Sequence, residues 1–210
     1  MDPNVLIYTC DAPPVDRAEI LRYAGVRGDA PEDLRAMLED CLSEALPCCS
    51  YRACYREFPI TRRKNLLDLG FAVTDSEHLS RNLADCTSVV LFAATLGIGI
   101  DRLISRYGRI SPTRSLLLQA IGNERAEALC DALDREIGER MKARGCFTRP
   151  RFSPGYGDLP LSLQTDVFSA LDCQKRIGLT LNKSLLMSPS KSVTAIIGIS
   201  PEPKKRPTAW

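Results

Sequence analysis

The sequence has only one histidine and one tryptophan among its 210 residues, and it lacks a long apolar run. The histidine, His78, follows a helix-start signal and is expected in a solvent-exposed first turn, which disfavours hydrolases that use a histidine base. The longest apolar run, residues 88–100, is interrupted by threonine and glycines and is too short to span a bilayer. The first ten residues lack the basic and apolar regions of a secretory signal. We therefore expect a cytoplasmic protein with no membrane partner.

Strong charge of one sign is also missing. The net charge is +2, and basic residues are interspersed with acidic ones. A nucleic-acid-binding protein would instead concentrate lysine and arginine on one face. Two short basic runs, residues 62–64 and 204–206, are expected on the solvated surface, and no nucleic-acid partner is predicted.

The nine cysteines are scattered and contain no Cys-x-x-Cys pair. In a reducing compartment most of them are expected to act as small buried hydrophobic residues. Residues 41–54 hold four of the nine, without a nearby histidine, and form the one group that would suit a metal or redox site. A cysteine-based metal or redox protein stays as a third reading of the sequence.

Hydrophobic residues make up 44% of the chain and charged residues 26%, as in a globular domain with a sizeable core. Apolar spacing, caps and breakers predict helices at residues 16–24, at 31–46, after a Thr74 cap, at 100–107, from Ser111-Pro112 to 143, and after a Ser162 cap. Strands are predicted at residues 51–58, 66–73, 88–95, 179–181 and 193–199. Residues 88–95 are apolar and β-branched enough for a central strand covered on both faces.

Charges alternate along residues 124–140 of the long helix, which predicts an exposed face with i,i+4 ion pairs. Residues 97–99 (GIG) follow a strand but lack the third glycine of a dinucleotide loop and the lysine of a P-loop. They are expected to form a tight turn.

Residues 151–160 (RFSPGYGDLP) concentrate special residue types more than any other stretch. Pro154 fixes one backbone angle, while Gly155 and Gly157 permit positive φ and close approach of a ligand. A guanidinium, a hydroxyl, a phenol and a carboxylate surround the bend. An ordinary turn is the simpler reading, but the number of constrained residues and the loop position favour a binding loop.

The run 151–156 resembles the Arg-x-x-x-Gly-Tyr signature of the activation domain of vitamin B12-dependent methionine synthase. Residues 178–184 (GLTLNKS), with 187–189 and 192–193, resemble the segment that follows in that family, and residues 93–97 (AATLG) resemble an upstream element. The resemblance spans roughly residues 88–200 in the same order along the chain.

The resemblance implies one α+β domain over residues 1–200, of which residues 1–75 are the part that it defines least. The proline-rich, basic composition of residues 201–210 predicts a disordered tail. We expect a mainly antiparallel, strongly twisted central sheet flanked by helices, with one long helix before the signature loop. In the resembled family the domain binds S-adenosylmethionine and presents its methyl group to cobalamin carried by another module. A flavodoxin-type protein commonly donates the electron that reactivation needs.

The family resemblance implies that Arg151 and Tyr156 bind S-adenosylmethionine. A guanidinium offers a planar fork to the ligand carboxylate, worth about 1.5–3 kcal/mol when desolvated. A phenol ring stacked on adenine or lying near the sulfonium adds roughly 0.5–2 kcal/mol. From its chemistry alone, Asp158 is expected to accept from the ligand ammonium or ribose.

The backbone at Ser153 and at Gly155 is expected to line the same cradle. Glu127 lies in a segment that resembles the family's helix before the signature loop, and it is expected to face the ligand. The chain departs from the family after Gly-Tyr, where Pro-Ala-Cys-Pro-Asp-His is replaced by residues 157–162 (GDLPLS). It also shows no match for the family's N-terminal acidic ligand and no cobalamin, folate or homocysteine module.

Two functions therefore follow from the sequence besides the cysteine-based reading. The first is a free-standing reactivation component that acts on a separate cobalamin-binding methionine synthase module or corrinoid protein, with S-adenosylmethionine as methyl donor. The alternative is a non-catalytic binding module that docks on a corrinoid protein without using S-adenosylmethionine.

Overall fold

Strand β6 (Ser88–Thr95) forms the centre of the fold, and all but its first residue are buried. The computed structural model, which describes residues 2–203, pairs it antiparallel with β2 (Arg52–Pro59) and with β10 (Ser192–Ser200). Strands β1 (Leu6–Thr9) and β7 (Phe147–Thr148) add the two edges, giving the order β1-β2-β6-β10-β7. The predicted central strand covered on both faces is confirmed.

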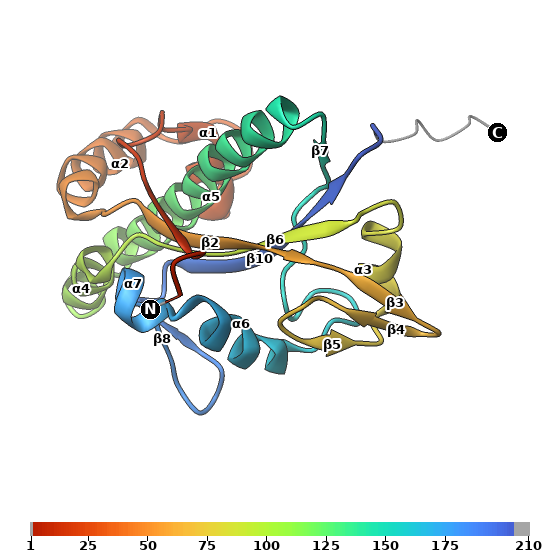
Figure 1. The fold of residues 1–210 in the computed structure, drawn as a ribbon. Coiled ribbons are helices and arrows are strands. Elements are labelled where there is room, and N and C mark those ends of the chain that lie inside the picture. Colours follow the sequence, from red (N-terminus) through yellow and green to blue (C-terminus); the bar gives the residue numbers. More distant parts are fainter. Residues whose placement is uncertain (1, 204–210) are drawn as a thin grey trace.

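Four helices cover one face of this sheet (Figure 1). They are α1 (Arg17–Tyr23), α2 (Glu32–Ala45), α4 (Ile98–Tyr107) and α5 (Pro112–Ala143), and a 3₁₀ turn (Leu46–Cys48) follows α2. The helix α5 has 32 residues and crosses the sheet before the chain enters β7 and the loop at residues 149–160. It is the predicted long helix.

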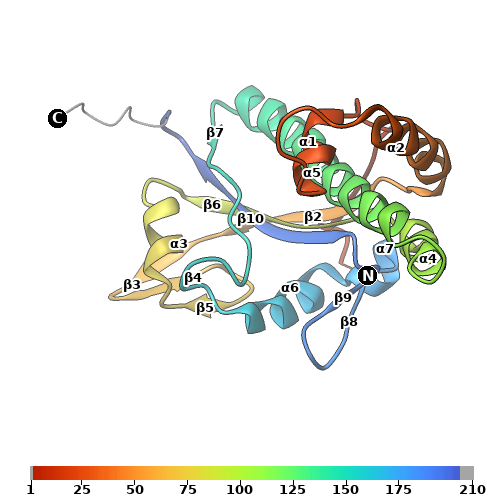
Figure 2. The ribbon, with the colours of Figure 1, turned by 180° about the vertical axis from the view of Figure 1, so that it is seen from behind.

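The other face carries smaller elements, as Figure 2 shows from behind. They are the sheet of β3 (Thr61–Arg63), β4 (Leu66–Asp68) and β5 (Val73–Thr74), the helices α3 (Glu77–Asn82), α6 (Gln164–Leu171) and α7 (Cys173–Ile177), a 3₁₀ turn (Leu161–Leu163), and the hairpin of β8 (Thr180–Leu181) and β9 (Met187–Ser188).

Alternation along β6 divides the apolar interior into two cores. Val90 and Phe92 point toward α5 and its neighbours, whereas Val89 and Leu91 point toward α3 and α6. Successive side chains of a strand face opposite sides, so a single apolar strand serves both layers. The expected fold, one α+β domain with an antiparallel sheet flanked by helices, is therefore confirmed.

The cap predicted at Thr74 is wrong. Thr74 ends β5, and its Oγ1 accepts from the Ser76 amide at 3.2 Å. Ser76 is the N-cap instead, because its hydroxyl accepts from the Leu79 amide at 3.1 Å. The motif contains two hydroxyls, those of Thr74 and Ser76. The direction in which the chain leaves β5 decides which of them reaches the free amides at the start of α3.

Other boundaries also differ from the predictions. The strand expected at 66–73 is two strands separated by a turn at Gly70, whose φ is 77°. The helix expected from residue 100 begins at Ile98, and Gly99 lies where a Cβ would be 2.2 Å from the Cys48 carbonyl oxygen. Ser162 lies in a 3₁₀ turn and does not cap α6.

Four strands, β1, β3, β7 and β9, had no sequence prediction. They are two to four residues long, too short for apolar periodicity to show. The predicted tail at 201–210 lies outside the described residues from residue 204 onward. Within the described chain, every helix is too short or too polar to cross a bilayer.

Candidate functional site

The loop at residues 149–160 begins as an extension of the sheet edge. The Arg149 amide donates to the Gly198 carbonyl at 2.8 Å, and Phe152 and Ile196 exchange two backbone hydrogen bonds of 2.9 Å. Because residues alternate along an extended segment, Arg151 and Phe152 face opposite sides of the sheet. Arg151 thus reaches α5, and Phe152 packs against the core under α6.

The bend that follows is tight, as its composition predicted. Gly155 donates to the Leu159 carbonyl at 2.9 Å, and Tyr156 donates to the Ser153 carbonyl at 3.1 Å. Gly155 has a φ of 89° and Gly157 a φ of 58°. The backbone oxygen of Ser153 is therefore already used within the turn.

The carboxylate of Asp158 holds the start of α3. It accepts from the Ser76 hydroxyl and from the amides of Glu77, at 2.8 Å, and His78, at 3.3 Å. These hydrogen bonds, led by that of Ser76, lower the pKa of Asp158. In this arrangement Asp158 stabilises a helix terminus, which uses the acceptor oxygens expected for a ligand.

Arg151 lies in a cluster of carboxylates on α5. Its guanidinium donates to Glu127 at 2.7 Å, to Asp131 at 2.8 Å and to Asp134. These three acidic residues are spaced by four and three positions and so share one face of the helix. The structure thus brings together Glu127 and Arg151, two of the predicted site residues.

Electrostatics in this cluster are unbalanced. Burial opposes the charge of Arg151, but the neighbouring carboxylates outweigh it and raise the pKa of the guanidinium. Burial also raises the pKa of Asp134, against the effect of Arg151. The second oxygen of Asp134, Oδ1, is buried without a hydrogen-bond partner in residues 2–203. Three carboxylates thus share one cation, and acceptors outnumber donors.

Tyr156 lies apart from this cluster. Tyr156 is 72% exposed, and its ring packs edge-to-face on Phe152 with 5.6 Å between centroids. The structure therefore separates the predicted site residues into two groups. Arg151 and Glu127 lie on the α5 side, whereas Tyr156 and Asp158 lie toward α3.

A hollow of about 470 Å³ between α1 and α5 adjoins the Arg151 cluster. Glu127 and Asp131 belong to its wall. The remaining lining residues, from the N-terminal segment, α1 and α5, are Pro13, Pro14, Asp16, Glu19, Tyr23, Glu124, Ala128 and Arg135. With five carboxylates and one arginine, the wall favours a cationic ligand.

Tyr23 places an aromatic ring in this acidic wall. Burial, with the charges of Glu127 and Glu19, raises the pKa of its hydroxyl. Asp16, beside it, caps α1 by accepting from the Glu19 amide at 3.0 Å. Sequence reasoning did not select Tyr23, because nothing local to it signals that α1 packs beside residues 124–135.

A buried ion pair holds the Pro13–Pro14 segment of the hollow's wall against α5. Arg125 is 0% exposed, bonds Glu124, and donates to the carbonyls of Pro13 at 2.5 Å and Pro14 at 2.6 Å. The exposed face predicted for residues 124–140 is therefore wrong at Glu124 and Arg125. Their burial depends on the Pro13–Pro14 segment, which crosses α5 and supplies the acceptors.

The four cysteines at residues 41–54, the one group that would suit a metal site, do not form such a site in the structure. Within residues 2–203, no three His, Cys, Asp or Glu side chains are arranged to hold a metal ion. Cys41 and Cys54 are buried on opposite faces of the sheet.

Comparison with known proteins places this geometry in a family. A crystal structure of the MetH reactivation domain bound to AdoHcy superposes with a TM-score of 0.70, covering 96% of this chain and 80% of that chain at 16% identity, which shows a common fold. No curated protein sequence matches the chain. The family model "Vitamin B12 dependent methionine synthase, activation domain" matches residues 76–205, more than half of the chain. This protein therefore belongs to the family of vitamin B12-dependent methionine synthase activation domains.

Proposed function

We propose that the protein binds S-adenosylmethionine in the hollow between α1 and α5, beside the Arg151 cluster, and serves the reactivation of a cobalamin-dependent enzyme. Membership of the activation-domain family is the observation that carries this proposal. The partner would be a methionine synthase cobalamin module or another corrinoid protein, and a flavodoxin-type protein would supply the reducing electron.

The charge of the hollow suits this ligand. S-Adenosylmethionine carries an ammonium and a sulfonium, and the wall holds an excess of carboxylates. Its ammonium would bring donors to Glu127 and Asp131 in a cluster where acceptors are in excess and where Asp134 Oδ1 has no partner among residues 2–203. Its carboxylate would take the place of one acidic side chain on Arg151, and the ligand ammonium would offset the negative charge that this carboxylate adds.

S-Adenosylmethionine would supply a methyl group, which leaves the sulfonium for the reduced cobalt of a partner's cobalamin, and S-adenosylhomocysteine would remain. This transfer requires no proton from the protein. The residues of this chain act by position: Arg151 and Glu127 hold the amino-acid end, and Tyr23 covers the ligand from α1. Holding the reacting groups in line and excluding water supply the rate advantage.

The non-catalytic alternative has one observation in its favour. The Arg151 guanidinium is already satisfied by Glu127, Asp131 and Asp134, so a ligand carboxylate has to displace one of them. A protein that only docks on a corrinoid partner would keep this cluster as a structural element.

Isothermal titration calorimetry with S-adenosylmethionine and S-adenosylhomocysteine distinguishes the two functions. The wild type is expected to bind both, and Arg151→Ala to bind roughly 10- to 100-fold more weakly, since one charged hydrogen-bond pair is lost. Glu127→Gln preserves the cluster's shape and is expected to weaken binding through its lost charge. Arg81→Ala, on exposed α3, is the control.

Wild-type protein that associates with a corrinoid partner but does not bind either nucleoside would support the docking module and contradict the proposal. Because Arg151→Ala leaves three carboxylates unneutralised, its thermal unfolding is measured in parallel. If Arg151→Ala is unstable, the weaker binding expected of Glu127→Gln relative to the wild type tests the proposal instead.

A further inference from the structure

A second hollow lies on the face of the sheet opposite α5. It has a volume of about 520 Å³ and lies between α6, α7 and the β8–β9 hairpin. This volume falls within the range of small-molecule sites. Neither Arg151 nor any residue of the acidic hollow contributes to its wall. The two hollows are therefore independent.

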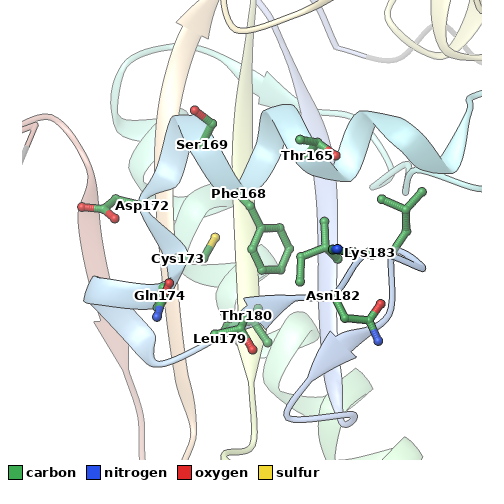
Figure 3. Close-up of a pocket in the computed structure, with 12 residues that line it drawn as sticks. Thr165, Phe168, Ser169, Asp172, Cys173, Gln174, Leu179, Thr180, Asn182 and Lys183 are labelled. Atoms are coloured by element: carbon green, nitrogen blue, oxygen red, sulfur yellow. The ribbon is translucent and has the colours of Figure 1, made fainter.

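The floor of the second hollow is apolar and aromatic. Phe168 is half-buried and Leu179 is fully buried. Figure 3 shows the Phe168 ring pointing from α6 toward Thr180 and Leu179. An aromatic ring presented in this way favours another flat ring, by offset or edge-to-face packing.

The polar groups beside Phe168 are uncommitted. Within residues 2–203, Lys183 makes no ion pair and the Thr165 hydroxyl makes no hydrogen bond. Figure 3 shows both on the same side of the Phe168 ring. The only carboxylate of the wall, Asp172, points away from them and lies 3.7 Å from Lys175. An unneutralised ammonium with a nearby hydroxyl favours an anionic group.

Asn182 shapes this side of the hollow. Its Oδ1 accepts from the amides of Ser184 at 2.8 Å and Leu186 at 2.9 Å, which leaves its NH₂ group free to donate. Its backbone oxygen also accepts from the Leu185 amide at 3.0 Å. The hairpin end that carries Lys183 is thus ordered before any ligand arrives.

Leu185 is held in an unfavourable conformation at the same place. Its φ is 60°, in the left-handed region that glycine and asparagine adopt more readily than leucine. The leucine side chain lines the hollow. Strain that persists in a hydrogen-bonded turn beside a cavity is typical of ligand-binding loops.

We propose that this hollow binds a small molecule in which a heteroaromatic ring is joined to one acidic group, with a nucleoside monophosphate as the representative. The ring packs on Phe168, the anion lies against Lys183 and the Asn182 amide, and Thr165 donates to a phosphate or ribose oxygen. The inference does not depend on S-adenosylmethionine binding at the other face.

Calorimetric titration with three fragments tests the chemistry. Adenosine 5′-monophosphate is expected to bind, whereas adenosine lacks the anion and ribose 5-phosphate lacks the ring, so each is expected to bind at least about tenfold more weakly. Titration repeated with saturating S-adenosylhomocysteine is expected to give the same affinity. Competition between the two would mean that nucleotide and nucleoside share a single site, and it would overturn the proposal of a second, independent site.

Variants locate the site. Lys183→Gln is expected to weaken binding about tenfold, and Phe168→Leu, which keeps an apolar side chain, about three- to tenfold. Lys142→Gln, in the last turn of α5 and outside the wall, is expected to bind as the wild type. Leu185→Gly is expected to raise the unfolding temperature by relieving strain and yet to bind more weakly. Absence of nucleotide binding by the wild type, or equal affinity in all four variants, would overturn the proposal.

Discussion

At the scale of single residues, the loop at 149–160 depends on two requirements at Gly157. Its backbone has a φ of 58°, and an added Cβ would lie 2.4 Å from the Nδ1 atom of His78. The glycine therefore combines a conformational need with a close approach. The sequence suggested the first need, but the second arises between residues far apart in the chain.

Gly157→Ala is expected to reduce the free energy of unfolding by about 1–3 kcal/mol, through backbone strain and the displacement of His78. Urea denaturation measures the loss. Gly145→Ala is the matched control, because Gly145 has a φ of 72° and nothing within 4 Å of its added Cβ. Equal losses in the two variants would show that His78 moves aside without cost.

The buried carboxyl of Asp134 is expected to make the stability of the protein depend on pH. Burial raises the pKa of this carboxyl in the folded protein, so the folded state retains the proton more strongly than the unfolded chain. The contribution of Asp134 to stability therefore falls as pH rises above the unfolded value of about 3.9, until the folded pKa is passed. Asp134→Asn removes this fall.

The stability of the wild type minus that of Asp134→Asn is thus expected to decrease over this window, by about 1.4 kcal/mol for each unit by which the pKa is raised. Denaturation curves collected from pH 3 to 7 provide the measurement. A difference that stays constant with pH would mean that Arg151 compensates the buried charge fully.

At the scale of elements, α3 shows how the loop and a helix stabilise each other. The helix has six residues, too few to be stable alone, and its N-terminal amides bond both Ser76 and the distant Asp158. The predicted ligand residue Asp158 therefore has a structural partner that is invisible in the local sequence.

Asp158→Asn is expected to expose the start of α3. Hydrogen exchange at the Glu77 and His78 amides should become faster, because a neutral amide is a weaker acceptor at a helix N-terminus. The low pKa of Asp158 means that its stabilisation is present at neutral pH and lost as pH falls through the folded value. Asp75→Asn serves as the charge control, and equal exchange in both variants would contradict this role.

Length explains which elements sequence analysis identified. The apolar run of β6 and the 32-residue helix α5 carry enough periodicity or composition to be recognised. The two residues of β7 carry none, and they form a strand only because β10 offers an unpaired edge. The site shows a related limit of sequence analysis. Arg151 was recognisable from its local motif, but the convergence of Asp131 and Asp134 on it depends on how α5 packs beside the loop and was not.

At the scale of the whole molecule, the N-terminal region is part of the single fold. The family model covers residues 76–205, but β1 and β2 lie before residue 76 and provide two of the five strands of the sheet. The helices α1 and α2 contribute Ile20 and Leu38 to the core beside α5. Without β1 and β2, β6 would become an exposed apolar edge of the sheet.

A fragment of residues 76–203 is therefore expected to lack a cooperative unfolding transition, whereas residues 1–203 should unfold in one step. Circular dichroism during thermal denaturation compares the two. A sharp transition in the shorter fragment would show that the region before residue 76 is an appendage rather than part of the core.

The sequence by itself indicated the central strand, the long helix and the bend after Arg151, because each depends on local patterns of apolar residues, proline and glycine, and its resemblance to a family implied the fold class. Only the tertiary structure decided that Arg151 pairs with three carboxylates of α5, that Asp158 caps α3, and that an acidic and an uncommitted polar hollow lie on opposite faces of one sheet. These features arise where segments distant in the chain meet, so their energies are set by packing and charge at that meeting and not by any one segment.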